Sequence, residues 1–180
     1  LYGNNTTIGN YTIYHNDPLE KEFIARIEQA TDLVKSGELY DANLNLQICL
    51  NDGSLYPVLM EKLRGAAFGW GFYNKVVLMG DAQPEENYIE LSGYKWNLSH
   101  LLAHEAVHCY QFHKLGLWQS NPIANYPKWE GYPEYVARRN ADQLDLTNNI
   151  SRLLESEKTE KDDWAVYFSD STIAPKDYYK

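Results

Sequence analysis

The stretch "LSHLLAHEAVHCYQFHKLG", residues 98–116, decides the expected architecture of this chain. Asn97 just before it is a suitable N-cap and Gly116 is a suitable stop, so the pattern predicts a helix from Leu98 to Leu115. Most residues around its central motif are uncharged, which is typical of a helix buried beneath a cleft. Four of the five histidines of the chain gather in this one segment: His100, His104, His108 and His113.

The motif HEAVH carries the candidate chemistry. His104 and His108 are four residues apart, so both rings lie on one face of the helix, about one turn from each other. Two imidazoles at this spacing can share one metal ion, and the pair suits zinc. Glu105, beside the first histidine, can lie next to the metal without binding it and take a proton from activated water. The alternative is a core helix whose histidines hydrogen-bond to protein partners.

This helix and the segment after it, residues 97–139, resemble the gluzincin group of zincin metallopeptidases. In that group the HExxH helix supplies two zinc ligands and the general base, and a glutamate on the next helix supplies the third ligand. Here "KWEGYPEYVARR" follows, and its Glu130 lies 22 positions after His108. The phrase "WEGYPEY" is similar to the Glu-Gly-x-Ala-x-Tyr sequence of several gluzincin families, with Pro133 in place of alanine. A helix beginning near Trp129, as the pattern predicts, tolerates this proline in or just after its first turn.

The resemblance implies a complete zinc site with an outer carboxylate. The implied ligands are His104, His108 and Glu130, and the implied general base is Glu105. Glu134, one turn beyond Glu130, is then the carboxylate that orients a ligand histidine, and a simple helix pair with Arg138 is the alternative. His100, one turn before His104, offers a second triplet of histidines. Three ligands on one straight helix cannot all face one ion well, so we expect His100 behind the ligands or at the surface.

Other features of the family are harder to assign from the residues. A metzincin site needs a third histidine six residues after the second, following a glycine. His113 comes five residues after His108 with no such glycine, so the sequence does not fit a metzincin site. An extended substrate is expected to add to the edge of a strand before the histidine helix, either "FYNKVVLMG" or "NYIEL", although both also suit ordinary sheet strands. Tyr178 and Tyr179 are candidates for stabilising an oxyanion only because they follow the second helix.

The remaining sequence predicts an α+β protein, zincin-like in the order of its elements, with a small mixed sheet, helices and a mostly helical C-terminal part. Strands are expected at residues 10–16, 44–50, 69–80 and 87–91. Helices are expected from an Asp17 cap to Gly37, from Pro57 to about residue 68, and from Trp129 to about residue 155. We expect a lobe of residues 1–116 that carries the HExxH helix and a helical lobe of residues 117–180 that carries the third ligand.

Composition narrows the class of partner. The formal net charge is −9 without a basic cluster, which argues against nucleic acid. No run approaches the ~20 apolar residues that span a bilayer. Cys49 and Cys109 are expected as buried free thiols, with a disulfide as the alternative. The chain begins at Leu1 rather than Met, which favours the removal of an N-terminal piece and hence a secreted or membrane-anchored protein.

The sequence therefore predicts a Zn²⁺-dependent peptidase that acts on a peptide or protein substrate. The alternative is a zinc-binding module on the same scaffold that has no turnover or that depends on a partner. Glu105 argues against a purely structural site, because a structural site needs ligands and no base.

Overall fold

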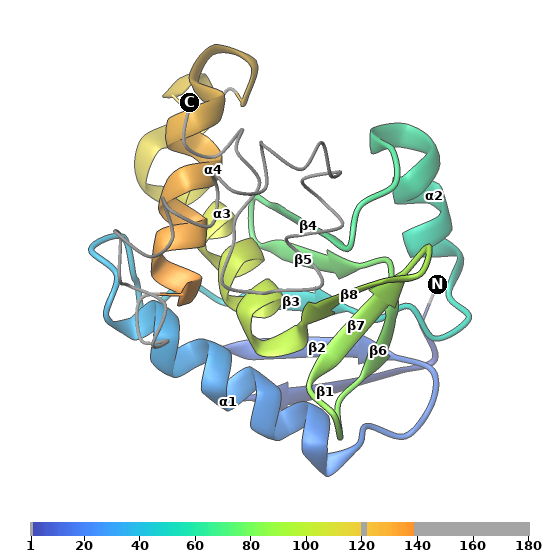
Figure 1. Cartoon of the computed structure of the whole chain (residues 1–180). Helices are drawn as coiled ribbons and strands as arrows, with labels where there is room; N and C mark the ends of the chain where they lie inside the picture. The colour runs from blue at the N-terminus through green and yellow to red at the C-terminus, as the bar shows by residue number, and fades with distance from the viewer. Residues whose placement is uncertain (1, 120–121, 139–180) are drawn as a thin grey trace, which may run out of the picture.

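The computed structural model describes residues 2–119 and 122–138 of the 180-residue chain. Within them lie four helices and two β-sheets, an α+β arrangement as predicted (Figure 1). The helices are α1 (Lys21–Lys35), α2 (Leu55–Arg64), α3 (Leu98–Gln119) and α4 (Pro122–Arg138). No helix in this part of the chain is long and apolar enough to cross a membrane.

The larger sheet has five strands in the order β1-β2-β3-β5-β4. They are β1 (Asn4–Ile8), β2 (Tyr11–His15), β3 (Leu46–Cys49), β4 (Gly69–Phe72) and β5 (Lys75–Leu78). The three central strands β2, β3 and β5 run parallel, whereas β1 and β4 pair antiparallel with them at the two ends. Strand β4 is therefore an edge strand among the described residues, and its outer backbone groups face away from the sheet.

Helices cover both faces of this sheet. Successive side chains of a strand point to opposite faces, so each strand contributes to both. Ile13, Ile48 and Val76 are neighbours across three strands and pack in the main core with α1 and α3. Cys49 points to the other face, where it packs with Met60 of α2. Helix α1 meets the main core with side chains at helical spacing: Phe23, Ile27, Ala30 and Val34. Each fully buried Phe, Ile or Val contributes about 1.5–3 kcal/mol to folding.

The smaller sheet leads directly into the histidine helix. It is antiparallel, in the order β6 (Asp81–Gln83), β7 (Tyr88–Leu91) and β8 (Tyr94–Asn97). Asn97 caps α3 as predicted, since its side-chain oxygen accepts the backbone N–H of His100 at 3.0 Å. Every residue of α3 from 101 to 111 is buried, and the helix contacts α1, α4 and β4. The regular helix breaks at Gly116, whose φ is +74°, so the predicted stop is confirmed.

The predicted strand at residues 69–80 is wrong in one respect, because the structure divides it into the hairpin β4–β5. The chain turns back at Tyr73, which adopts a φ of +55°. Because no glycine or proline marks this turn, the pattern of residues 69–80 predicted one continuous strand. Strands β1, β6 and β8 were not predicted. β1 is polar and mostly exposed, and the other two are only three and four residues long.

Two helices begin elsewhere than predicted. Helix α1 starts at Lys21 with Glu20 before it, not after an Asp17 cap, and the Asp17 N–H bonds to the Asp52 carboxylate. Helix α2 starts at Leu55, two residues before Pro57, and its cap is the Ser54 side chain, which accepts the N–H of Tyr56 at 3.2 Å.

Helix α4 also begins earlier than predicted. It starts at Pro122 rather than near Trp129, and proline suits a first helical position because its missing N–H has no helical partner there. Pro133 therefore lies in the interior of the helix, not in its first turn. The part of the predicted helix beyond Arg138 lies outside the described residues, so the division into two lobes stays a prediction.

The two cysteines confirm the expectation of buried free thiols. Cys49 lies in β3 and Cys109 in α3, both buried and unlinked. Cys109 packs against the sheet, with its sulfur 3.4 Å from the backbone oxygen of Lys75 in β5.

Candidate metal centre

The two motif histidines meet on the face of α3 that points toward α4. His104 and His108 are both buried, and their ring centroids are 4.8 Å apart. Their Nε2 atoms lie 3.1 Å from each other. The four-residue spacing thus brings one nitrogen of each ring to a single point, as the sequence predicts.

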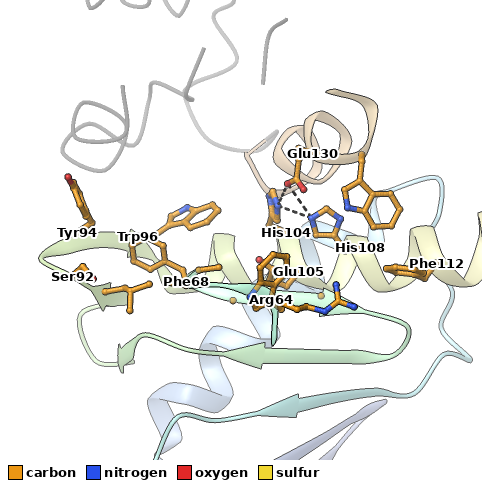
Figure 2. A pocket seen from close by; sticks show the side chains of 17 residues that line it. Arg64, Phe68, Ser92, Tyr94, Trp96, His104, Glu105, His108, Phe112 and Glu130 are labelled. Carbon is orange, nitrogen blue, oxygen red and sulfur yellow. Dashed lines mark hydrogen bonds and ion pairs between the residues drawn. The ribbon is translucent and has the colours of Figure 1, made fainter. Parts of the chain in front are cut away.

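Glu130 of α4 completes a triangle of donor atoms with these histidines. Its Oε2 lies 3.3 Å from Nε2 of His104 and 3.4 Å from Nε2 of His108 (Figure 2). Two nitrogen lone pairs and one carboxylate oxygen therefore converge on the same small volume. This buried cluster can hold a metal ion.

The outer nitrogen of each ring is also fixed. Nδ1 of His104 lies 3.3 Å from Oε2 of Glu134, which forms an ion pair with Arg138. Nδ1 of His108 lies 3.0 Å from Oε1 of Gln111. When both Nδ1 atoms donate to these oxygens, both Nε2 lone pairs face the centre.

The electrostatics of the cluster favour one positive charge among its donors. Burial alone would lower the pKa of His104, but hydrogen bonds to Glu130 and Glu134 outweigh it and raise the pKa to about 10. Burial alone would raise the pKa of Glu130, but hydrogen bonds from His104 and His108 hold it well below its ordinary value. A cation in this position is therefore stabilised by its surroundings.

Glu105 lies beside the triangle but is not one of its donors. It is buried, and β4 lies directly on it, since a Cβ on Gly71 would overlap the Glu105 backbone oxygen. A Cβ on Gly69 would come within 3.1 Å of the Glu105 Cγ. Burial raises the pKa of the Glu105 carboxyl, which brings it closer to the range in which it can exchange a proton at neutral pH.

A cleft of about 550 Å³ opens over the triangle, and both Glu105 and Glu130 line it. Its walls come from β4, β8, α3, α4 and the loop after α2. Aromatic side chains dominate these walls: Phe68, Trp70, Tyr94, Trp96, Phe112 and Trp129. Arg64, at the end of α2, is the only Lys or Arg among the described residues of the lining. Its guanidinium carbon lies 5.0 Å from the Phe72 ring centroid.

The strand that borders this cleft differs from the two predicted for substrate pairing. "NYIEL" contains β7, which is paired on both sides by β6 and β8. "FYNKVVLMG" contains β5, which lies between β3 and β4. Both candidates are wrong because their backbone groups are already used. In the larger sheet the edge strand at this cleft is β4, whose Gly69, Trp70 and Gly71 line it.

The other candidate residues lie apart from the triangle. His100 is not one of its donors. Burial, and then the charge of Arg138, lower the His100 pKa to about 4. His113 is half exposed, with Nε2 3.8 Å from Asp41 on the surface. Tyr178 and Tyr179 lie outside the described residues.

Sequence reasoning missed two residues that contact the histidines. Gln111 is three residues after His108, a helical spacing that would have shown the contact. Trp129 stacks on His108, with ring centroids 4.9 Å apart and ring planes 20° apart, and only the approach of α4 reveals this contact.

Comparison of the chain with models of protein families, with curated proteins and with solved structures gives no match. The class of protein must therefore be argued from the site.

Proposed function

We propose that this protein is a zinc-dependent peptidase of the zincin type, in which His104, His108 and Glu130 bind Zn²⁺. One observation carries the proposal, namely the size of the donor triangle. A tetrahedral zinc ion with bonds of about 2.0–2.1 Å to nitrogen and oxygen holds its ligand atoms roughly 3.3 Å apart. The three donor separations are 3.1, 3.3 and 3.4 Å. Three ligands also leave the fourth position that catalytic zinc sites keep open.

The chain's own residues suit the hydrolysis of a peptide bond. Bound zinc would make a water molecule acidic and polarise a carbonyl group in the cleft. Glu105 is adjacent to the donors and can take the proton from that water, then deliver it to the nitrogen that leaves. The open edge of β4 can hold an extended backbone by strand addition. The aromatic walls make the lining of the cleft largely apolar, which strengthens electrostatic interactions inside it. The likeness of "HEAVH" and "WEGYPEY" to gluzincin sequences supports the same assignment.

The experiment separates metal binding from turnover. Wild-type protein purified without added zinc should contain close to one zinc per chain and should cleave members of a mixed peptide library, detected by mass spectrometry. Glu105→Gln should keep its zinc and lose turnover by ~100-fold or more, because only the base is removed. Glu28→Gln, the same change at an exposed position of α1, is the matched control and should resemble wild type.

Two results would count against the proposal. A Glu105→Gln protein as active as wild type excludes the proposed base. A wild-type protein that holds zinc but cleaves no peptide favours the alternative of a zinc-binding module without turnover.

A further inference from the structure

Pro133 occupies a position that proline usually destabilises. It lies in the interior of α4, where it has no N–H to donate to the carbonyl four residues earlier. That carbonyl belongs to Trp129. It nevertheless has a donor, because the side-chain Nε2 of Gln111 reaches it from α3 at 3.2 Å.

The same Gln111 amide holds a histidine of the metal centre. Its oxygen lies 3.0 Å from Nδ1 of His108, and its nitrogen donates to the Trp129 oxygen, so the two contacts fix which way the amide faces. With the nitrogen anchored on Trp129, only the oxygen can face His108, and Nδ1 must then be the protonated nitrogen. In the neutral ring that binds a metal, the Nε2 lone pair is then left pointing toward Glu130 and His104.

We propose that Pro133 is a positioning residue for the metal centre: it leaves the Trp129 carbonyl to Gln111, and Gln111 orients His108. This inference rests on the proposed metal site and adds a role for the residue that departs from the gluzincin pattern. An alanine at this position would supply an N–H that competes for the Trp129 oxygen. The Gln111 amide would lose its anchor, and its two ends could exchange.

The substitution Pro133→Ala therefore has two effects of opposite sign. Zinc-free protein should melt at a higher temperature, by roughly 5–10 °C, because an interior proline is removed from a helix. Zinc affinity, measured by competition with a chelator, should fall by about tenfold, toward the lower end of losses for partners of metal ligands. A purely structural role would not weaken zinc binding in a more stable protein.

A double-mutant cycle tests whether the effect passes through Gln111. Gln111→Leu should lower zinc affinity by ~10–100-fold, and adding Pro133→Ala to it should cause no further loss. If Pro133→Ala weakens zinc binding equally with and without Gln111, or not at all, the proposal is wrong.

A measurement without metal keeps this result separate from the proposed function. The side-chain NH₂ of Gln111, followed by NMR, should exchange slowly with solvent in zinc-free wild type and faster in Pro133→Ala. If wild type binds no zinc, the proposed function fails, and this exchange rate still decides whether Pro133 leaves the Trp129 carbonyl to Gln111. Equal exchange rates in the two proteins would overturn it.

Discussion

The two sides of the candidate metal centre hold equivalent histidines with opposite kinds of partner. The His104 side consists of His104, Glu134 and Arg138, and the His108 side consists of His108, Gln111 and Trp129. The first side uses a buried carboxylate paired with a buried guanidinium. The second uses a neutral amide fixed on a backbone carbonyl. One side therefore places a carboxylate with its guanidinium partner behind the histidine, and the other places a neutral amide there.

The partner that contacts Nδ1 therefore has a different effect on each of the two rings. A carboxylate behind an imidazole makes the ring a stronger donor toward a metal, while an amide chiefly selects the tautomer. Glu130 stands between the two sides, because its Oε2 contacts both Nε2 atoms. Substitutions at Glu130, Glu134 and Gln111 should therefore lower zinc affinity to different degrees.

The largest effect is expected from Glu130→Ala, which removes the residue common to both sides. Zinc affinity should fall by more than ~100-fold, because losing a direct ligand costs more than losing a partner of a ligand. The fold should survive, since the Glu130 side chain is 18% exposed and lies at the cleft. Competition with a chelator measures the affinity. Tyr135→Ala, at a residue of the same helix that is 52% exposed, should leave it unchanged.

An intermediate effect is expected from Glu134→Gln, which replaces the carboxylate behind His104 with an amide like the one behind His108 and leaves Arg138 without its ion-pair partner. Zinc affinity should fall by ~10–100-fold, which is less than for Glu130→Ala in the same assay. If Glu134→Gln proves the more damaging of the two, Glu134 is the ligand and the assignment of this helix is one turn out. If neither change matters, the third ligand lies elsewhere and the gluzincin-type assignment fails with it.

The smallest effect concerns pH in zinc-free protein. The pKa of His104 is raised to about 10 in the folded state, above an ordinary value of about 6.5. Its stabilising contribution is therefore complete below pH 6.5 and is lost as the pH rises toward 10. The pKa of Glu130 is lowered, so its contribution is present above about pH 4.5 and is lost in acid.

The melting temperature of chelator-treated protein should consequently be highest between about pH 4.5 and 6.5 and should decline toward pH 10. Bound zinc needs the neutral ring, so the stabilisation by zinc should instead grow as the pH rises. His104→Asn should remove the alkaline decline. A decline of equal size in His104→Asn would show that another group causes it.

Local signals account for the parts of this site that the sequence predicted. The Asn97 cap, the Gly116 stop and the spacing of His104 and His108 all act within one helix, so neighbouring residues determine them. The structure brings Glu130 to the same point, as the resemblance implied. The contacts of Gln111 could not be foreseen from residue types alone, because they depend on how α4 arrives from another segment.

The elements that were missed share a different cause. Helix α4 was expected to begin near Trp129, yet it begins at Pro122 and packs against α3 despite the interior proline Pro133. The β4–β5 hairpin turns at Tyr73 without glycine or proline, and its edge position follows only from the order of strands in the sheet. Non-local pairing decided both, and a single sequence carries little record of it.

The aromatic contacts of the two histidines have an optical consequence. Trp129 stacks on His108, and Trp96 meets His104 edge-on with ring centroids 5.6 Å apart. Two of the five tryptophans of the chain thus touch the rings on which a metal would sit. Indole fluorescence is quenched by a nearby protonated imidazole and by paramagnetic ions such as Co²⁺ or Cu²⁺. The tryptophan fluorescence of the unlabelled protein therefore changes when a proton or such a metal ion binds to or leaves these histidines. It serves as a built-in reporter of the state of the site.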